Sequence, residues 1–153
     1  LSKEEINETS YGEISQELKD IKKNSSPKNI AKAVINIRKR KLPDIKVLGN
    51  AGSFFKNPII SNKKFSNLRK IYTDIVGYPV SKNETKIAAG WLIDNAGLKG
   101  LRKGDAGIHD KQALVLVNYG EATGLEILNL AKEVQLKIKK MYDIILEFEV
   151  NIV

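Results

Sequence analysis

A serine in a stretch of small residues is the first candidate for chemistry in this chain. Ser53 lies in the middle of Gly49–Pro58, which reads GNAGSFFKNP. The two glycines let the backbone bend sharply or approach a ligand with no Cβ in the way. A hydroxyl there can donate or accept a proton, and Lys56 and Asn57 beyond it can hold an anionic or polar ligand. The alternative is a Gly-rich loop with Ser53 as an ordinary turn residue, because this string has no fixed mechanism attached.

Nucleophilic hydrolysis by Ser53 is disfavoured. The chain has one histidine, His109, and no G-x-S-x-G elbow. A hydroxyl can instead act as a general acid that delivers a proton to a carbanion formed beside it. We interpret His109 as structural and Trp91 as a core anchor. The chain has no cysteine, which excludes disulfides and thiolate metal sites, and we expect no metal centre.

Glu149 is the second candidate. From Leu146 onward apolar residues alternate with Glu147, Glu149 and Asn151, which predicts a strand with its carboxylates on one face. Glu149 then faces solvent or a cleft rather than the core. A solvated strand glutamate is the alternative and the commoner fate of such residues.

The patterns around these candidates predict an α+β fold, with helices packed on a small, largely antiparallel sheet. We expect residues 1–26 to be a linker or the end of a preceding domain, and residues 27–153 to form one domain. Residues 10–24 have weak periodicity and predict a connecting segment. The expected elements are a helix from Ser26 to about Arg40 with Ile30, Ala31, Val34, Ile35 and Arg38 on one face, extended residues 45–48, a strand at 58–60, a helix from Ser61 to Gly77, a short helix at 86–96, a strand at 113–118, and a helix from a Thr123–Glu126 capping box to about Lys140.

Composition restricts the class of protein. The 153 residues are 42% hydrophobic and 29% charged, and no apolar run is long enough to span a bilayer, so we expect a cytoplasmic protein. The N-terminus has no initiator methionine and no signal-peptide apolar block, which suits a piece of a longer protein. We find no sustained heptad or large apolar stripe, and we expect a monomer.

The net charge of +8 raises the rival hypothesis of a small basic module that binds nucleic acid or acidic partners. Arginine hydrogen-bonds to base edges and binds phosphates through two N–H groups at once. It occurs only at positions 38, 40, 69 and 102, and the other cations are lysine. The densest cluster, Arg38–Lys41, ends a predicted helix, where cations are favourable against the macrodipole. A solvated, lysine-rich surface explains the charge better, and we expect no nucleic-acid or membrane partner.

Five motifs occur in a recognisable order: Lys41–Asp44, Gly49–Pro58, Ala88–Asp94, Gly104–Asn118 and Leu146–Val150. From about Thr9 to its end, the chain resembles the C-terminal, substrate-binding part of the UDP-N-acetylenolpyruvoylglucosamine reductase family. These are flavoenzymes that complete UDP-N-acetylmuramic acid for peptidoglycan.

The resemblance implies roles for six residues. Reduced flavin passes hydride to the enolpyruvyl double bond of UDP-N-acetylglucosamine enolpyruvate, and Ser53 protonates the carbon left negative. Glu149 assists the enolate-like intermediate, either protonated or through a water, although Phe148 stands where many members have proline. The residues that match UDP-sugar contacts are Lys41, Asn57, Tyr78 and Gln112, of which the lysine suits a diphosphate and the amides suit uracil and sugar hydroxyls. An ordinary helix-terminal packing role for Tyr78 and a strand-edge role for Gln112 are the alternatives.

The family's flavin-binding part precedes everything in this sequence. The resemblance therefore implies that FAD and NADPH belong to the full-length enzyme, with the FAD site in a missing N-terminal domain. We expect this chain alone to bind no flavin, to give a colourless preparation and to turn over no substrate.

Overall fold

A computed structural model describes residue 9 and residues 13–153. Residues 1–8 and 10–12, with the charged N-terminus and the start of the predicted connecting segment, lie outside the described residues. The chain divides after Pro43 into two compact units, which are described one at a time. The functional boundary that we expect at residue 26 stays a prediction.

The first unit is a pair of helices, α1 (Ile14–Asp20) and α2 (Pro27–Lys41). The helix predicted from Ser26 is confirmed, whereas the connecting segment predicted at 10–24 is wrong because it contains α1. A helix of seven residues has little intrinsic stability, so packing on α2 rather than periodicity fixes it. The buried face of α2 is also rotated from the predicted one: Ala33 is buried and Ile35 is exposed. The apolar contact is formed by Ile14, Leu18 and Ala33, with Ile21, Ile30, Val34 and Ile37 around them.

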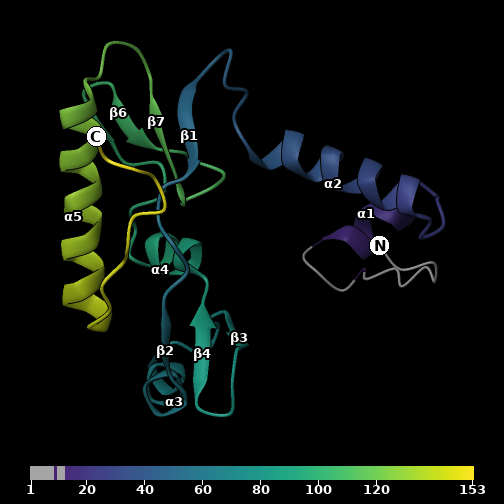
Figure 1. Ribbon diagram of the computed structural model, residues 1–153, viewed down its shortest axis with the longest axis horizontal. Helices are drawn as coiled ribbons and strands as arrows, with labels where there is room; N and C mark the ends of the chain where they lie inside the picture. Colours follow the sequence, from purple (N-terminus) through teal and green to yellow (C-terminus); the bar gives the residue numbers. More distant parts are fainter. Residues whose placement is uncertain (1–8, 10–12) are drawn as a thin grey trace. The chain divides into compact units, whose positions relative to one another are not determined.

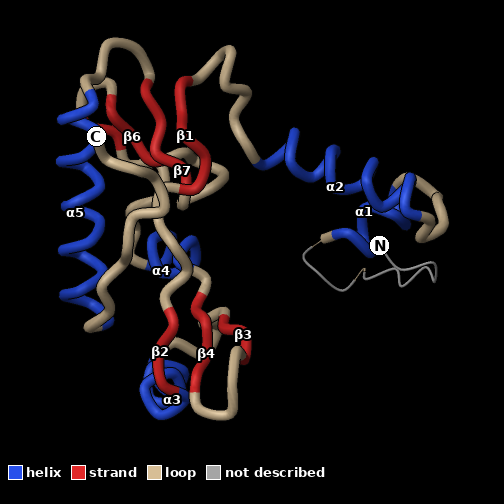
Figure 2. Tube along the Cα trace, in the orientation of Figure 1, coloured by secondary structure: helices blue, strands red, loops and turns tan. Residues whose placement is uncertain are grey.

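The second unit contains two antiparallel sheets, which confirms the α+β class (Figures 1 and 2). The four-stranded sheet has the order β1-β7-β6-β5 and the three-stranded sheet has the order β2-β4-β3. Helix α4 lies between the two sheets, and α5 runs along β6 and β7. The bounds are β1 Gly49–Ser53, β2 Ile59–Ser61, α3 Asn62–Ile71, β3 Gly77–Pro79, β4 Glu84–Ile87, α4 Ala89–Asn95, β5 Arg102–Lys103, β6 Ala106–Ile108, β7 Val115–Asn118 and α5 Gly124–Tyr142.

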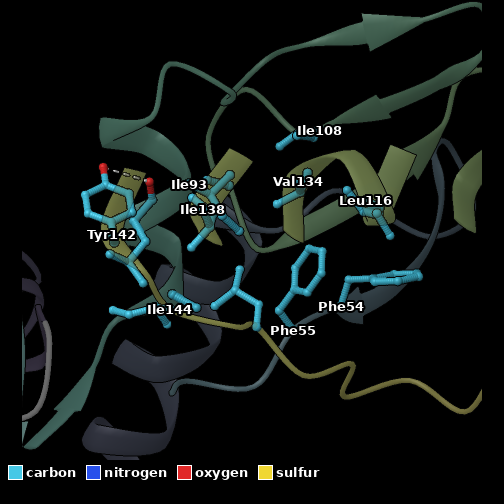
Figure 3. Packing of buried hydrophobic residues seen from close by; sticks show 14 of the residues in the cluster. Phe54, Phe55, Ile93, Ile108, Leu116, Val134, Ile138, Tyr142 and Ile144 are labelled. Carbon is cyan, nitrogen blue, oxygen red and sulfur yellow. Dashed lines mark hydrogen bonds between the residues drawn. The ribbon is translucent and has the colours of Figure 1, made fainter. Parts of the chain in front are cut away.

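The core of this unit forms where α5 and α4 meet the four-stranded sheet (Figure 3). Ile93, Ile108, Val134 and Ile138 are almost fully buried there. Helix α5 begins at the predicted capping box, in which Glu126 N donates to the Thr123 hydroxyl and Thr123 N donates to the Glu126 carboxylate. The predicted strand at 113–118 and the strand after Pro58 are confirmed as β7 and β2.

Four expected elements are different in the structure. The helix from Ser61 ends at Ile71, and Gly77–Pro79 is strand β3 rather than the region after a helix end. A Cβ on Gly77 would lie 2.5 Å from the Phe65 ring, so close packing, rather than a helix stop, requires this glycine. Residues 45–47 form a turn, and β1 starts only at Gly49. The helix expected at 86–96 begins at Ala89, after strand β4. The C-terminal segment makes one isolated bridge instead of a regular strand.

No helix in the described part of the chain combines the length and apolar character needed to cross a membrane. Among residue 9 and residues 13–153, no three histidine, cysteine, aspartate or glutamate side chains are grouped so that they could hold a metal ion.

Candidate functional site

Ser53 is the last residue of β1 and follows a bulge. Between the pairs Asn50↔Val117 and Ser53↔Val115, β1 advances three residues while β7 advances two. Gly52 takes up the extra residue at φ +76°, a left-handed conformation that favours glycine. The Asn50 side chain accepts a hydrogen bond from Gly52 N at 3.0 Å and fixes the bend. The small residues of the motif therefore build a strand end that re-aims Ser53, rather than a loop.

The residue after Ser53 is held from both sides. Phe54 N donates to Leu114 O at 2.8 Å, and Phe54 O accepts from Glu149 N at 2.9 Å. Lys56 N in turn donates to Glu147 O of the C-terminal segment at 2.9 Å. The C-terminal segment consequently runs antiparallel to residues 54–56, as Figure 1 shows for the yellow end of the chain beside β1. Ser53 and Glu149 are thus brought to one crossing of the backbone, and both side chains are exposed.

Three phenylalanine rings pack together where the C-terminal segment crosses residues 54–56. Phe148 lies edge to face with Phe54 at 5.6 Å between ring centroids, and it lies 5.8 Å from Phe55. Phe54 and Phe55 are 5.5 Å apart and both are buried (Figure 3). Such pairs contribute beyond their buried area because ring edges meet ring faces. Phe148 therefore supplies an aromatic anchor beside Glu149. It stands where many members of the family that this sequence resembles have proline.

Asn57 is tied to the start of α4. Its Oδ1 accepts a hydrogen bond from Ala89 N at 2.8 Å, and Ile87 N donates to the neighbouring Pro58 O at 2.8 Å. Ala88, the N-cap residue of α4, has no side-chain cap of its own. The amide oxygen of Asn57 therefore satisfies a helix N–H, and its NH₂ end is the part that a ligand would meet.

Gln112 and Tyr78 occupy different surroundings. A Cβ placed on Gly90 would be 3.4 Å from Gln112 Oε1, so the Gln112 amide lies over the start of α4, near the helix turn that Asn57 caps. Tyr78 lies in β3, pairs with Lys86 of β4 and is 52% exposed. Tyr78 therefore lies in a strand rather than at a helix end, and its exposure leaves the hydroxyl accessible.

Lys41 lies in the first unit, at the end of α2. Its Nζ is 2.7 Å from Glu13 Oε1, and Arg40 binds the other carboxylate oxygen of Glu13 at 3.0 Å. The hydrogen bonds from Lys41 and Arg40 lower the pKa of Glu13. Sequence reasoning missed Glu13. An acidic residue before one helix and basic residues at the end of the next were the signal in the sequence that could have indicated this ion pair.

Two cavities are lined by residues close to Ser53 and Glu149 in the sequence, but neither Ser53 nor Glu149 lines them. One of about 270 Å³ is lined by Lys56, Asn57, Pro58, Ile59, Ile145 and Glu147, and Lys56 Nζ is 3.3 Å from Glu147 Oε2. A larger apolar one of about 510 Å³ lies between Ala51, Phe54, the first residues of α5 and residues 150–153. In the sequence, the Lys56–Asn57 pair indicated the polar cavity. Glu147 was considered only as part of the alternating pattern that includes Glu149.

The two residues interpreted as structural are packed inside the unit. His109 is buried, and its backbone N–H donates to Val115 O at 2.9 Å. Trp91 packs against the rings of Tyr72 and Tyr142, and its indole N–H donates to Asp74 at 3.2 Å. The His109 bond ties the end of β6 to β7, the Trp91 contacts position α4, and both sets of contacts fit structural roles.

Comparison with known proteins identifies the class. Residues 43–153 match the family described as UDP-N-acetylenolpyruvoylglucosamine reductase, C-terminal domain. The fold is similar to the crystal structure of UDP-N-acetylenolpyruvylglucosamine reductase from Thermus caldophilus, with a TM-score of 0.50 and 29% identity over 81% of this chain and 33% of that one. The chain belongs to this C-terminal domain family.

Curated relatives carry the same name. UDP-N-acetylenolpyruvoylglucosamine reductase of Flavobacterium johnsoniae is 53% identical over 95% of this chain and 43% of its own length. The reductase of Pseudomonas syringae pv. tomato is 45% identical over 99% of this chain and 45% of its own length. The chain therefore spans less than half the length of the relatives it matches.

Proposed function

We propose that this chain is the nucleotide-sugar-binding part of a flavin-dependent reductase that converts UDP-N-acetylglucosamine enolpyruvate to UDP-N-acetylmuramate with NADPH. The observation that carries the proposal is membership of the C-terminal domain family, together with relatives about half identical that bear the reductase name. FAD, when bound, would accept a hydride from NADPH and pass a hydride on to the enolpyruvyl double bond. We assign the FAD site to the part of the relatives that this chain does not span.

Within this chain, Ser53 donates a proton to the carbon next to the substrate carboxylate. The double bond then gains one hydride and one proton, so the reduction is balanced. Glu149 offsets the negative charge that grows on this carboxylate before the proton arrives, either as the protonated acid or through a water. The backbone crossing supports this pairing, because Glu149 N donates to the carbonyl of the residue that follows Ser53.

Four residues bind the nucleotide sugar in this proposal. The Lys41 ammonium attracts the diphosphate, and the amides of Asn57 and Gln112 with the Tyr78 hydroxyl bond uracil, phosphate or sugar oxygens. The exposure of Tyr78 and the shared position of Asn57 and Gln112 at the start of α4 support the assignment. The cytoplasmic location belongs to the proposal as well, since a charged nucleotide sugar does not cross a lipid bilayer unaided.

Calorimetric titration of the chain with UDP-N-acetylglucosamine enolpyruvate tests the proposal. We expect saturable binding of one ligand per chain that weakens in Lys41→Ala. Lys103→Ala, which removes an exposed lysine paired with Glu133, is the matched control and leaves the affinity within about twofold. Binding to any polyanion with a steep salt dependence, and no preference for the nucleotide sugar, would instead favour the rival basic module.

A further inference from the structure

Lys41 already has an anionic partner in this structure. Its ammonium lies 2.7 Å from Glu13 Oε1, and the two side chains are 41% and 46% exposed. An ion pair this open to water is weak, because solvent screens the charges and holding two long side chains together costs entropy. A ligand from solution can therefore reach the pair and replace one member of it.

The rest of the helix pair does not depend on Glu13. Arg40 is held a second time by Glu17 at 2.9 Å, and the Glu17 side chain is 7% exposed. Asn36 Nδ2 also donates to Glu17 at 3.0 Å. Together with the buried contact between α1 and α2, these bonds keep the helices in place when the Glu13 carboxylate no longer binds Lys41 and Arg40. Removing the Glu13 carboxylate should therefore act chiefly on Lys41.

We propose that Glu13 competes with the ligand's diphosphate for Lys41, so that the nucleotide sugar binds by displacing an internal carboxylate. This inference rests on the proposed function, which assigns Lys41 to the diphosphate. Both anions seek the same ammonium, and a diphosphate with two charges attracts it more strongly than one carboxylate does. Glu13 lowers the affinity for the ligand because it occupies the Lys41 ammonium while no ligand is bound.

The test is a thermodynamic cycle, measured by calorimetry on the full chain with UDP-N-acetylglucosamine as the probe. We expect Glu13→Gln to tighten binding about two- to fivefold, the range that an exposed ion pair allows. In a Lys41→Ala background the same substitution should have no effect. Glu133→Gln is the matched control, since it removes the same charge and frees a different lysine, Lys103.

The outcomes separate this inference from the proposed function. If Lys41→Ala weakens binding but Glu13→Gln does not tighten it, the competition is overturned and the assignment of Lys41 stands. Weaker binding by Glu13→Gln would mean that Glu13 positions Lys41 and would also overturn it, as would equal tightening by Glu133→Gln. If the wild-type chain binds no nucleotide sugar, or Lys41→Ala has no effect, both proposals fail.

A folding control accompanies these variants. Circular dichroism should show unchanged helix content in Glu13→Gln. If α1 is lost in that variant, Glu13→Asp replaces it, because this substitution keeps the charge but shortens the reach to Lys41. We then expect binding of the nucleotide sugar to tighten by a smaller factor. No change in affinity for Glu13→Asp would count against the competition.

Discussion

The side chain of Asn57 has two ends, which the structure assigns to different partners. The oxygen accepts the N–H of Ala89, whereas the NH₂ group is available to a nucleotide sugar in the proposed function. Asn57→Ala should therefore lower the free energy of unfolding by about 1–3 kcal/mol, because a helix N–H loses its acceptor, as well as weaken binding.

Asn57→Asp separates the two effects. The carboxylate still accepts from Ala89 N but offers no donor to a ligand, so we expect stability within about 0.5 kcal/mol of wild type and weakened binding. Urea unfolding and calorimetry measure the two quantities. A loss of stability in Asn57→Asp as large as that in Asn57→Ala would show that the bond to Ala89 is not what Asn57 contributes.

Asp105 gives a pH dependence whose sign follows from its partners. The backbone N–H of Glu121 and the guanidinium of Arg102 donate to its carboxylate at 2.9 and 2.8 Å, and they lower its pKa. The unfolded value, about 3.9, is then higher than the folded one. The carboxylate contributes stability above about pH 4 and loses this contribution as the pH falls through the folded pKa.

We therefore expect Asp105→Asn to be less stable than wild type at pH 7, and the difference to shrink as the pH falls below 4. Urea unfolding at several pH values measures it. A difference that stays constant down to pH 2 would show that the ionised form is not what stabilises the loop between β7 and α5.

At the scale of elements, the caps of two helices make a matched pair. Thr123 caps α5 through its hydroxyl and its backbone N–H, whereas Ser26 precedes α2 without a side-chain cap bond. Thr123→Ala should lower the free energy of unfolding by about 1 kcal/mol, and Ser26→Ala should change it by less than about 0.5 kcal/mol. Thermal and urea unfolding provide the comparison; equal losses in both variants would contradict the role of the capping box.

The helices that carry their own start signals could be predicted from the sequence. Pro27 at the first position of α2 and the capping box of α5 are local signals, and both starts are where the sequence places them. Helix α1 and strands β3 to β6 have no such signal, because each is short and is stabilised only by packing or pairing with another segment. Gly77 misled the prediction because a glycine required by packing against Phe65 looks the same in a sequence as a helix-ending glycine.

The candidate site residues stay predictions, and the geometry around them was not foreseen. The bulge at Gly52 depends on pairing with β7, and the bond from Glu149 N to Phe54 O depends on the C-terminal segment, both far from Ser53 in the sequence. The alternation after Leu146 likewise predicted which side chains are exposed, although the segment forms only one bridge. The contact of Lys41 with Glu13 requires the packing of α1 on α2, which was not foreseen.

At the scale of the whole molecule, the net charge of +8 has a local explanation in much of the chain. The last turns of α2, α3 and α5 all carry basic residues, where they oppose the negative end of the helix dipole. Others pair with acids, as Lys56 does with Glu147 and Lys64 with Asp143. This distribution fits a solvated, lysine-rich surface better than a general polyanion-binding protein.

The central claim is that Ser53 delivers the proton that completes the reduction. Rapid mixing of a full-length reductase that carries this chain separates two steps, reduction of flavin by NADPH and its reoxidation by UDP-N-acetylglucosamine enolpyruvate. In Ser53→Ala we expect the first rate to stay within about twofold and the second to fall by about 100-fold or more, the usual contribution of a general acid. Ser66→Ala, an exposed serine of α3, should change neither rate. An equal loss in both steps of Ser53→Ala, or an unchanged reoxidation rate, would contradict the claim.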